Sequence, residues 1–441
     1  MKICMMTNTY LPHVGGVARS VSTFAHEFIR QGHEVLVVAP TFPGKPLAPA
    51  REAIVERVPS LHNFNDSDFS VRLPFVAALS DRLERFQADV IHAHHPFLLG
   101  DTALRVALNK NVPIVFTHHT RYEDYTHYVP FSDAMKEIAI ELPTQFANLC
   151  DGVIAPSESI ARLIRRRGVT APMTVVPTGI DVAAFAAADG ARARARHGIP
   201  RGALVVGHVG RLAPEKNLGY LAAAVAAFLR ARPDARFLVV GDGPARAEFQ
   251  AVFAEQGVDD RLVLAGKRTG AALREAYRAM DLFAFASRSE TQGMVVAEAM
   301  AAKLPVVALN ATGVREVVGA GNGVLLPADT PAVDFATALG ALAGDAPRRT
   351  RLARGAAETA AEFSRERSAA RVLAFYAEVR RDTRARRLLH DLHPWVALIK
   401  RLGLEWDLLA TRTQTLATAV FGETKERTTR ASEPPVATLE P

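Results

Sequence analysis

Short apolar runs alternate with longer stretches of helical periodicity along most of the chain. The apolar runs end in small or polar residues, which is typical of buried parallel strands, and the stretches between them have the length and spacing of helices. This alternation predicts an α/β protein with doubly wound parallel sheets. The predicted strands are Lys2–Thr7, Glu34–Ala39, Asp89–Ala93, Ile114–His118, Gly152–Pro156 and Thr174–Pro177 in the first half, and Leu204–Val209, Arg236–Gly241, Leu262–Ala265, Asp281–Ala286, Pro305–Leu309 and Gly323–Pro327 in the second.

The segment Asp181–Pro200 separates the two sets of strands, and it is rich in Ala, Arg and Gly without a strand pattern. We therefore predict two Rossmann-like domains joined by a linker near residues 178–200. Residues 380–387 form a basic run, a stretch with two tryptophans follows, and the chain from about 423 onward has a composition typical of disorder. The predicted division is residues 1–180, 200–362, 363–387 (last helix and basic run) and 388–441 (amphipathic extension and tail).

Composition narrows the class of protein. The 441 residues are 49% hydrophobic and 22% charged, which is typical of a globular protein. The two cysteines, Cys4 and Cys150, imply no disulfide framework and fit a reducing compartment. We expect a cytoplasmic protein because there is no signal-peptide pattern and no apolar run long enough for a membrane span. The net charge of +7 suits an anionic ligand or surface, and because no nucleic-acid-binding motif occurs, we expect no nucleic-acid partner.

Two glutamates, Glu290 and Glu298, flank the end of one predicted strand and the start of the next helix. Gly293 lies between them, where a glycine lets the backbone turn and lets a ligand approach the helix N-terminus formed by Met294 and Val295. Ligands of open α/β sheets bind at the carboxyl ends of the strands. Because carboxylates accept hydrogen bonds from hydroxyls in pairs, this arrangement suits a sugar or a ribose. The alternative is a helix cap and a solvated face.

Three further turns follow predicted strands in the same way. The first contains Gly15 and Gly16 and could bring backbone N–H groups to a phosphate, although a purely structural turn explains it equally well. In the second half, Arg211 and Lys216 place positive charge where a diphosphate between two domains needs it, unless they are a surface charge pair. The third, at Gly241, is a tight turn directed to the same crevice.

The chain resembles glycosyltransferase family 4 over about residues 1–375. The resemblance lies in the order and combination of these turns and of the two glutamates, which have seven residues between them. The resemblance implies a retaining, metal-independent enzyme with the GT-B fold, in which two Rossmann-like domains face a central cleft. The N-terminal domain would hold the acceptor and the C-terminal domain the nucleotide sugar. The last helix, expected at Phe363–Arg380, would cross back onto the N-terminal domain.

The resemblance also implies roles for individual residues. Arg211 and Lys216 would bind the nucleotide diphosphate, with the Gly16 backbone presented to it. Glu298 would hold the ribose hydroxyls, and Glu290 would contact hydroxyls of the donor hexose. The remaining residues of the expected donor site are Gly15, Gly241, Gly293, Met294 and Val295.

The segment Phe116–Pro130 resembles the diacylglycerol glucosyltransferase branch, with phosphatidylinositol mannosyltransferases as more distant relatives. In that branch one histidine after this strand points at the reaction centre, and we expect it to be His119, since it precedes Thr120 as in the family's His-Thr pair. Strand alternation would direct its neighbour His118 elsewhere. The alternative is a satisfied core histidine.

A double displacement would need a carboxylate nucleophile, and none is evident in the N-terminal motifs. The resemblance implies front-face attack by the acceptor instead. Arg211, Lys216 and helix N-termini would stabilise the leaving phosphate, and His119 would contact the donor sugar. We expect no metal cofactor and therefore activity in the presence of a chelator. The donor would be UDP-glucose or GDP-mannose.

Three features favour a lipid acceptor: the His-Thr-x-Tyr-Glu segment at 119–123, the amphipathic stretch Ala134–Cys150, and the basic cluster of Arg162, Arg165, Arg166 and Arg167. The C-terminal run adds Trp395 and Trp406 beside basic residues, a composition typical of a membrane interface. Each could instead be a core-facing helix or a solvated face. The leading hypothesis is transfer of a hexose, with glucose favoured, to a lipid such as diacylglycerol at an anionic membrane surface. The protein would be cytoplasmic or peripheral on the inner face of the cell membrane. The alternatives are a soluble or polysaccharide acceptor and a catalytically silent binding protein.

Overall fold

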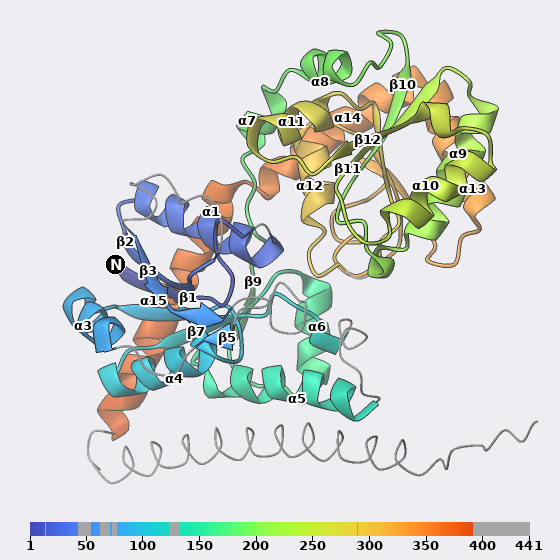
Figure 1. The fold of residues 1–441 in the computed structure, drawn as a ribbon. Coiled ribbons are helices and arrows are strands. Elements are labelled where there is room, and N and C mark those ends of the chain that lie inside the picture. Colours follow the sequence, from blue (N-terminus) through green and yellow to red (C-terminus); the bar gives the residue numbers. More distant parts are fainter. Residues whose placement is uncertain are drawn as a thin grey trace, which may run out of the picture.

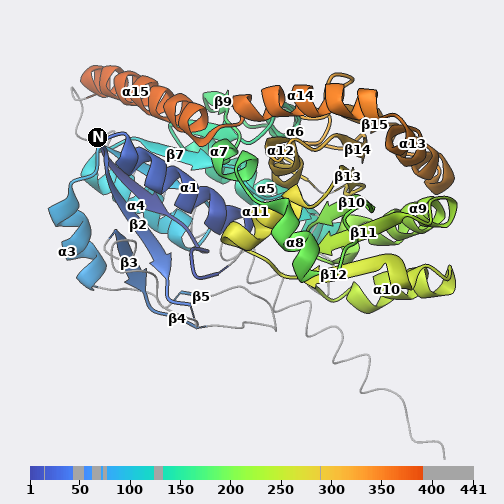
Figure 2. The same cartoon turned by 90° about the horizontal axis from the view of Figure 1, so that it is seen from above.

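The computed structural model describes residues 1–13, 15–42, 54–61, 71–72, 77–123, 133–288 and 290–390. These residues form two lobes, each built on a parallel sheet with helices on both faces (Figures 1 and 2). Two further strands, β4 (Ser60–Leu61) and β5 (Val71–Arg72), pair antiparallel outside the large sheets.

The N-terminal sheet has the strand order β3-β2-β1-β6-β7-β8-β9, and β1 lies near its middle, paired in parallel with β2 and β6. Alternate residues of β1 enter two separate cores. Ile3 and Met5 pack with α1 and the C-terminal helix α15, whereas Cys4 and Met6 pack on the opposite face. The elements are β1 (Lys2–Met6), α1 (Gly16–Arg30), β2 (Glu34–Pro40), β3 (Val55–Val58), α3 (Ala77–Phe86), β6 (Val90–Ala93), α4 (Leu99–Lys110), β7 (Ile114–Thr117), α5 (Asp133–Leu149), β8 (Gly152–Ala155), α6 (Glu158–Arg166) and β9 (Met173–Val175).

The C-terminal sheet has the order β12-β11-β10-β13-β14-β15, so the strand order reverses between β10 and β13. Such a reversal opens a crevice at the carboxyl ends of the strands, where ligands of doubly wound folds bind. The elements are β10 (Leu204–Val209), η3 (Pro214–Lys216), α9 (Leu218–Ala231), β11 (Ala235–Val240), α10 (Arg246–Glu255), η4 (Asp259–Arg261), β12 (Leu262–Gly266), α11 (Gly270–Arg278), β13 (Leu282–Phe285), α12 (Met294–Ala301), β14 (Val306–Leu309), β15 (Gly323–Leu326), α13 (Ala332–Gly344) and α14 (Ala346–Glu362).

The chain crosses between the lobes twice, and the two crossings lie side by side. A β-bridge joins Ile180 to Ser364, and Arg365 pairs with Asp181. After this point α15 (Arg365–His390) runs back along the N-terminal lobe, as the orange ribbon in Figure 1 shows. Buried Tyr376 of α15 makes a 2.6 Å hydrogen bond to His92 of β6. The crossing therefore belongs to the packed structure of both lobes.

The parallel α/β class and the positions of all twelve predicted strands are confirmed, with differences of one or two residues at their ends. The segment predicted as a linker, residues 178–200, contains no strand, but it is not without secondary structure. Two short helices, α7 (Val182–Ala186) and α8 (Gly190–Arg196), form there and pack on α11. Their N-caps, Asp181 and Asp189, each accept a backbone hydrogen bond. Residues 391–441, with both tryptophans and the predicted tail, lie outside the described residues.

Candidate active site

The loop between β13 and α12 carries Glu290, and its geometry depends on glycine. Gly293 has φ +73°, a left-handed conformation that residues with a Cβ adopt only with strain, and it directly precedes Met294, the first residue of α12. Gly313, at φ +74°, packs so closely on the loop that a Cβ there would lie 2.8 Å from the Gln292 nitrogen. These close backbone contacts hold the loop at the carboxyl edge of the sheet.

Glu290 and Lys216 form an ion pair, with 2.7 Å between Lys216 Nζ and Glu290 Oε1, and both side chains are mostly buried. Ser287 Oγ donates a second hydrogen bond to the same carboxylate oxygen at 3.0 Å. Lys216 ends the short helix η3, and the next residue, Asn217, donates from its side chain to the Ala286 carbonyl at the end of β13. The structure thus brings together two predicted site residues from different strands.

The charge state of Glu290 follows from this pairing. Burial alone would raise the pKa of its carboxyl, but the Lys216 charge and the hydrogen bonds from Lys216 and Ser287 outweigh burial and leave the pKa below its ordinary value. Glu290 is therefore an anion at neutral pH and can only accept hydrogen bonds, which suits contact with sugar hydroxyls.

The turns that follow β10 and β11 pack closely against each other. Gly241 has φ +151°, and a Cβ there would collide with the Gly210 carbonyl, while Leu212 N–H donates to the Asp242 carbonyl at 3.1 Å. Arg211 lies on this double turn with its side chain exposed. Within the described part of the chain Lys216 is held by Glu290, whereas Arg211 is exposed to solvent.

Glu298 on α12 is fully buried, and its carboxylate joins the two lobes. Oε2 accepts a 2.9 Å hydrogen bond from Tyr277 of α11, and Oε1 forms an ion pair with Arg19 of α1. Burial raises the pKa of the Tyr277 hydroxyl, so Tyr277 acts as a neutral donor. A ribose that used Glu298 would have to share this carboxylate with Arg19 or displace it.

The start of α1 leaves room for a ligand. Gly15 is its N-cap, and a Cβ there would lie 3.1 Å from His13 Nε2. Around the position that a Gly16 Cβ would take, the described residues outside the backbone of α1 place no atom within 4 Å. Helix N-termini with free N–H groups attract anions. Gly16 therefore has open space where a side chain would begin, in contrast to Gly15 and Gly241.

His119 is half-buried and is held by a second histidine that sequence reasoning missed. The Nδ1 atom of His94, which follows β6, lies 2.9 Å from His119 Nε2, and the two rings stack with centroids 5.2 Å apart. His118, by contrast, turns into the interior toward Phe116 and Tyr122. The two neighbouring histidines, which directly follow β7 (Ile114–Thr117), therefore have different surroundings, as the alternation of a strand predicts.

Burial lowers the pKa of both His119 and His94 well below the ordinary histidine value, helped by neighbouring histidines. Both rings are neutral at pH 7, so one nitrogen of the 2.9 Å contact carries the proton and the other accepts it. A neutral His119 with one nitrogen engaged by His94 can offer its other nitrogen to a substrate hydroxyl.

His94 should therefore act as a positioning residue. His94→Leu is expected to lower kcat by roughly ten- to hundredfold with a smaller change in donor KM, because His119 loses its orientation. His94→Asn, whose amide can replace Nδ1, should recover part of the activity. Steady-state kinetics of the two variants test this expectation, and equal losses in both would show that His94 only fills space.

Three polar contacts join the two lobes beside the glutamate loop. Gln292 binds the backbone N–H and carbonyl of Thr178 at 2.7 and 2.9 Å. Ser157, the N-cap of α6, donates to the Thr291 carbonyl at 2.7 Å. Glu316 accepts from the backbone N–H groups of residues 158 and 159 and so caps α6 from the other lobe. None of these residues was predicted, because their partners are distant in sequence.

Glu316→Ala should weaken the contact between the two lobes. Two N–H groups at the start of α6 lose a charged acceptor, which costs about 1–2 kcal/mol at a partly exposed helix end. We expect a larger radius of gyration by small-angle X-ray scattering for the ligand-free protein. Glu248→Ala, a change at an exposed glutamate of α10, is the control, and equal radii for the two variants would contradict the expectation.

Neither a cluster of three metal-ligating side chains nor a helix long and apolar enough to cross a membrane occurs among the described residues. What the described residues do form is a pair of Rossmann-like domains with a glutamate, a lysine and glycine turns at the carboxyl edge of the second sheet. This arrangement defines a glycosyltransferase of the GT-B class.

Comparison with known proteins agrees. The Glycosyltransferase Family 4 model matches residues 14–184, and the model for Glycosyl transferases group 1 matches residues 203–345. An alpha-monoglucosyldiacylglycerol synthase of Streptococcus pneumoniae is 31% identical over 70% of this chain and 71% of its own. A GDP-mannose-dependent alpha-mannosyltransferase of Mycobacterium tuberculosis is 32% identical over 74% of this chain and 84% of its own.

The fold also matches that of Anabaena HepE in complex with UDP, with a TM-score of 0.70 at 23% identity over 86% of this chain and all of the other. The protein belongs to glycosyltransferase family 4 and is a hexosyltransferase, as the sequence motifs indicate.

Proposed function

We propose that this protein transfers a hexose, with glucose favoured, from a nucleotide sugar to a membrane lipid such as diacylglycerol, with retention of anomeric configuration and without a metal. The observation that carries the donor part is the buried Lys216–Glu290 pair, which sets a fixed cation beside a fixed hydroxyl acceptor. The lipid part is supported by the relatives named as alpha-monoglucosyldiacylglycerol synthases, from Streptococcus pneumoniae and Acholeplasma laidlawii.

In this proposal the acceptor hydroxyl oxygen forms a bond to the anomeric carbon on the face from which the diphosphate departs. The bond between that carbon and the diphosphate oxygen breaks, and the hydroxyl proton passes to the leaving phosphate. Lys216, Arg211 and the N-termini of α1 and α12 stabilise the growing phosphate charge. Glu290 holds hexose hydroxyls, Glu298 holds the ribose, and His119 contacts the sugar.

A mannosyl donor is the second candidate. It is favoured by relatives named as GDP-mannose-dependent alpha-mannosyltransferases, whose identity to this chain is similar to that of the lipid synthases. We propose the cytoplasmic face of the membrane as the place of action, because nucleotide sugars and an anionic lipid surface meet there.

The test is transfer from radiolabelled UDP-glucose and GDP-mannose to diacylglycerol in phosphatidylglycerol vesicles, with and without EDTA. A labelled α-glycolipid from one donor, formed equally well in EDTA, is the expected result. Donor hydrolysis without glycolipid would contradict the lipid acceptor, loss of activity in EDTA would contradict metal independence, and a β-linked product would contradict retention.

A further inference from the structure

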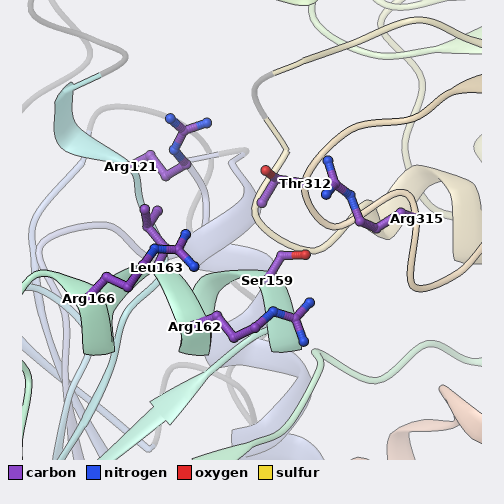
Figure 3. A pocket seen from close by; sticks show the side chains of 7 residues that line it. All are labelled: Arg121, Ser159, Arg162, Leu163, Arg166, Thr312 and Arg315. Atoms are coloured by element: carbon purple, nitrogen blue, oxygen red, sulfur yellow. The ribbon is translucent and has the colours of Figure 1, made fainter. Parts of the chain in front are cut away.

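A cavity of about 190 Å³ lies between the two lobes on the side of α6. Four arginines line it together with Ser159 and Thr312 (Figure 3). Arg121 follows β7, Arg162 and Arg166 lie on α6, and Arg315 faces them from the loop after β14 in the other lobe. The volume is about six times the roughly 30 Å³ of one liquid water, which is enough for a phosphate group with some of its hydration.

Two described glutamates lie beside this arginine pocket, and each is already engaged. Glu123 pairs with Arg121 at 3.1 Å and with Arg167 at 2.6 Å, and Glu316 is engaged at the start of α6. Neither Arg162 nor Arg166 pairs with a carboxylate within the described ranges. Guanidinium groups that line one cavity repel each other, and an anion bound between them would relieve this repulsion.

Ser159 adds a donor to the pocket. Its Oγ is buried and has no hydrogen-bond partner among the described residues. A buried hydroxyl without a partner costs free energy comparable to a lost hydrogen bond, which a ligand oxygen at this place would recover. A phosphate offers several oxygens to guanidinium forks and a hydroxyl at once, whereas a carboxylate has only two.

The pocket adjoins both halves of the candidate active site. Arg121 lies two residues after His119, and Thr312 precedes Gly313, which packs on Thr291 and Gln292 of the glutamate loop. A group bound in the pocket would therefore lie on the N-terminal, acceptor-holding side of the reacting atoms.

We propose that the arginine pocket is a binding site for the phosphate group of a molecule that approaches on the acceptor side. The phosphate has two possible sources, the headgroup of an anionic phospholipid and a soluble phosphate ester. Because Arg315 faces the pocket from the other lobe, the bound phosphate would also link the two lobes. Diacylglycerol carries no phosphate, so this site is additional to the proposed acceptor and does not depend on its identity.

The test uses the full chain without a donor, so it does not depend on transfer. The probes are glycerol 3-phosphate in calorimetry and sedimentation with vesicles of phosphatidylglycerol or of phosphatidylcholine alone. The pocket variant combines Arg162→Gln and Arg166→Gln. Its control is Arg165→Gln, which removes an exposed charge from the same helix but does not line the pocket.

For the pocket variant we expect a loss of at least roughly tenfold in affinity, since charge-assisted hydrogen bonds are removed, and little change for the control. Loss confined to phosphatidylglycerol vesicles identifies a lipid headgroup as the source, and loss of glycerol 3-phosphate binding identifies a soluble ester. Ser159→Val, which fills the pocket without changing its charge, should weaken the same interaction. Equal effects in the pocket variant and Arg165→Gln, or no binding of either probe by the unaltered protein, would overturn the proposal.

Discussion

Lys216→Met is expected to lower kcat by about 10²- to 10³-fold, the range found when one preorganised stabiliser of transition-state charge is removed. The substitution also leaves the buried Glu290 carboxylate without its cation. Because the Lys216 charge is the main influence that lowers the pKa of Glu290, that pKa should rise in the variant. A fraction of Glu290 would then be protonated near neutral pH and would no longer accept sugar hydroxyls in the same way.

The measurement is kcat and KM from pH 5 to 8 with the donor identified by the transfer assay. An acidic limb that moves to higher pH in Lys216→Met would report the raised pKa of Glu290. Lys267→Met, at an exposed lysine after β12, controls for the loss of one positive charge. A kcat within about threefold of the unaltered protein would contradict the role of Lys216 in leaving-group stabilisation.

Combining Lys216→Met with Glu290→Gln tests whether the two residues act as a pair or independently. Glu290→Gln alone should abolish most transfer while largely retaining nucleotide diphosphate binding, since the ribose and diphosphate contacts are proposed elsewhere. Because the two side chains touch at 2.7 Å, their effects should not add, and the double variant should lose less than the product of the two single losses.

The strands were predictable because each is a short apolar run that ends in glycine or a polar residue, and this pattern is local. The same rule located Glu290 and Lys216 at strand ends, where topology brings them together. β3 escaped prediction because it is an edge strand with Glu56 and Arg57 at its centre. The helices α7 and α8 were missed because their Ala- and Arg-rich sequences were taken for a linker, although Asp181 and Asp189 are recognisable cap residues.

The contacts that position the candidate site were not predictable in this way. His94 and His119 are 25 residues apart, and Glu316 caps a helix start 158 residues before it. Such pairings depend on which strands become neighbours and on how the lobes meet, and neither is encoded in local periodicity. The one usable signal was the strand end at His94, since β6 and β7 are adjacent and their carboxyl ends must lie together.

Acidification is expected to destabilise the fold between pH 6.5 and 5, before most carboxylates titrate. Burial lowers the pKa of His92 and His95 to about 3 and that of His118 and His208 to about 4, and it lowers those of His94 and His119 as well. These rings stay neutral in the native protein, but the unfolded chain binds a proton at each of them below about pH 6.5. The unfolded state therefore gains protons first, and stability falls as pH decreases.

The effect on the free energy of unfolding should be large, because each such histidine can contribute up to about 1.4 kcal/mol per pH unit in this window. After allowance for partial relaxation of the native protein, we expect the free energy of unfolding to fall by about 5 kcal/mol by pH 5. Urea unfolding at pH 7.5, 6 and 5 measures it. His118→Phe should flatten the dependence, because Phe keeps the ring contacts with Phe116 and Tyr122 but takes up no proton. His197→Gln, at a partly exposed histidine whose pKa burial lowers less strongly, should change it little. A free energy of unfolding that stays constant from pH 7.5 to 5 would show that these histidines are already protonated or accessible in the native protein, and the neutral His94–His119 contact would then have to be abandoned.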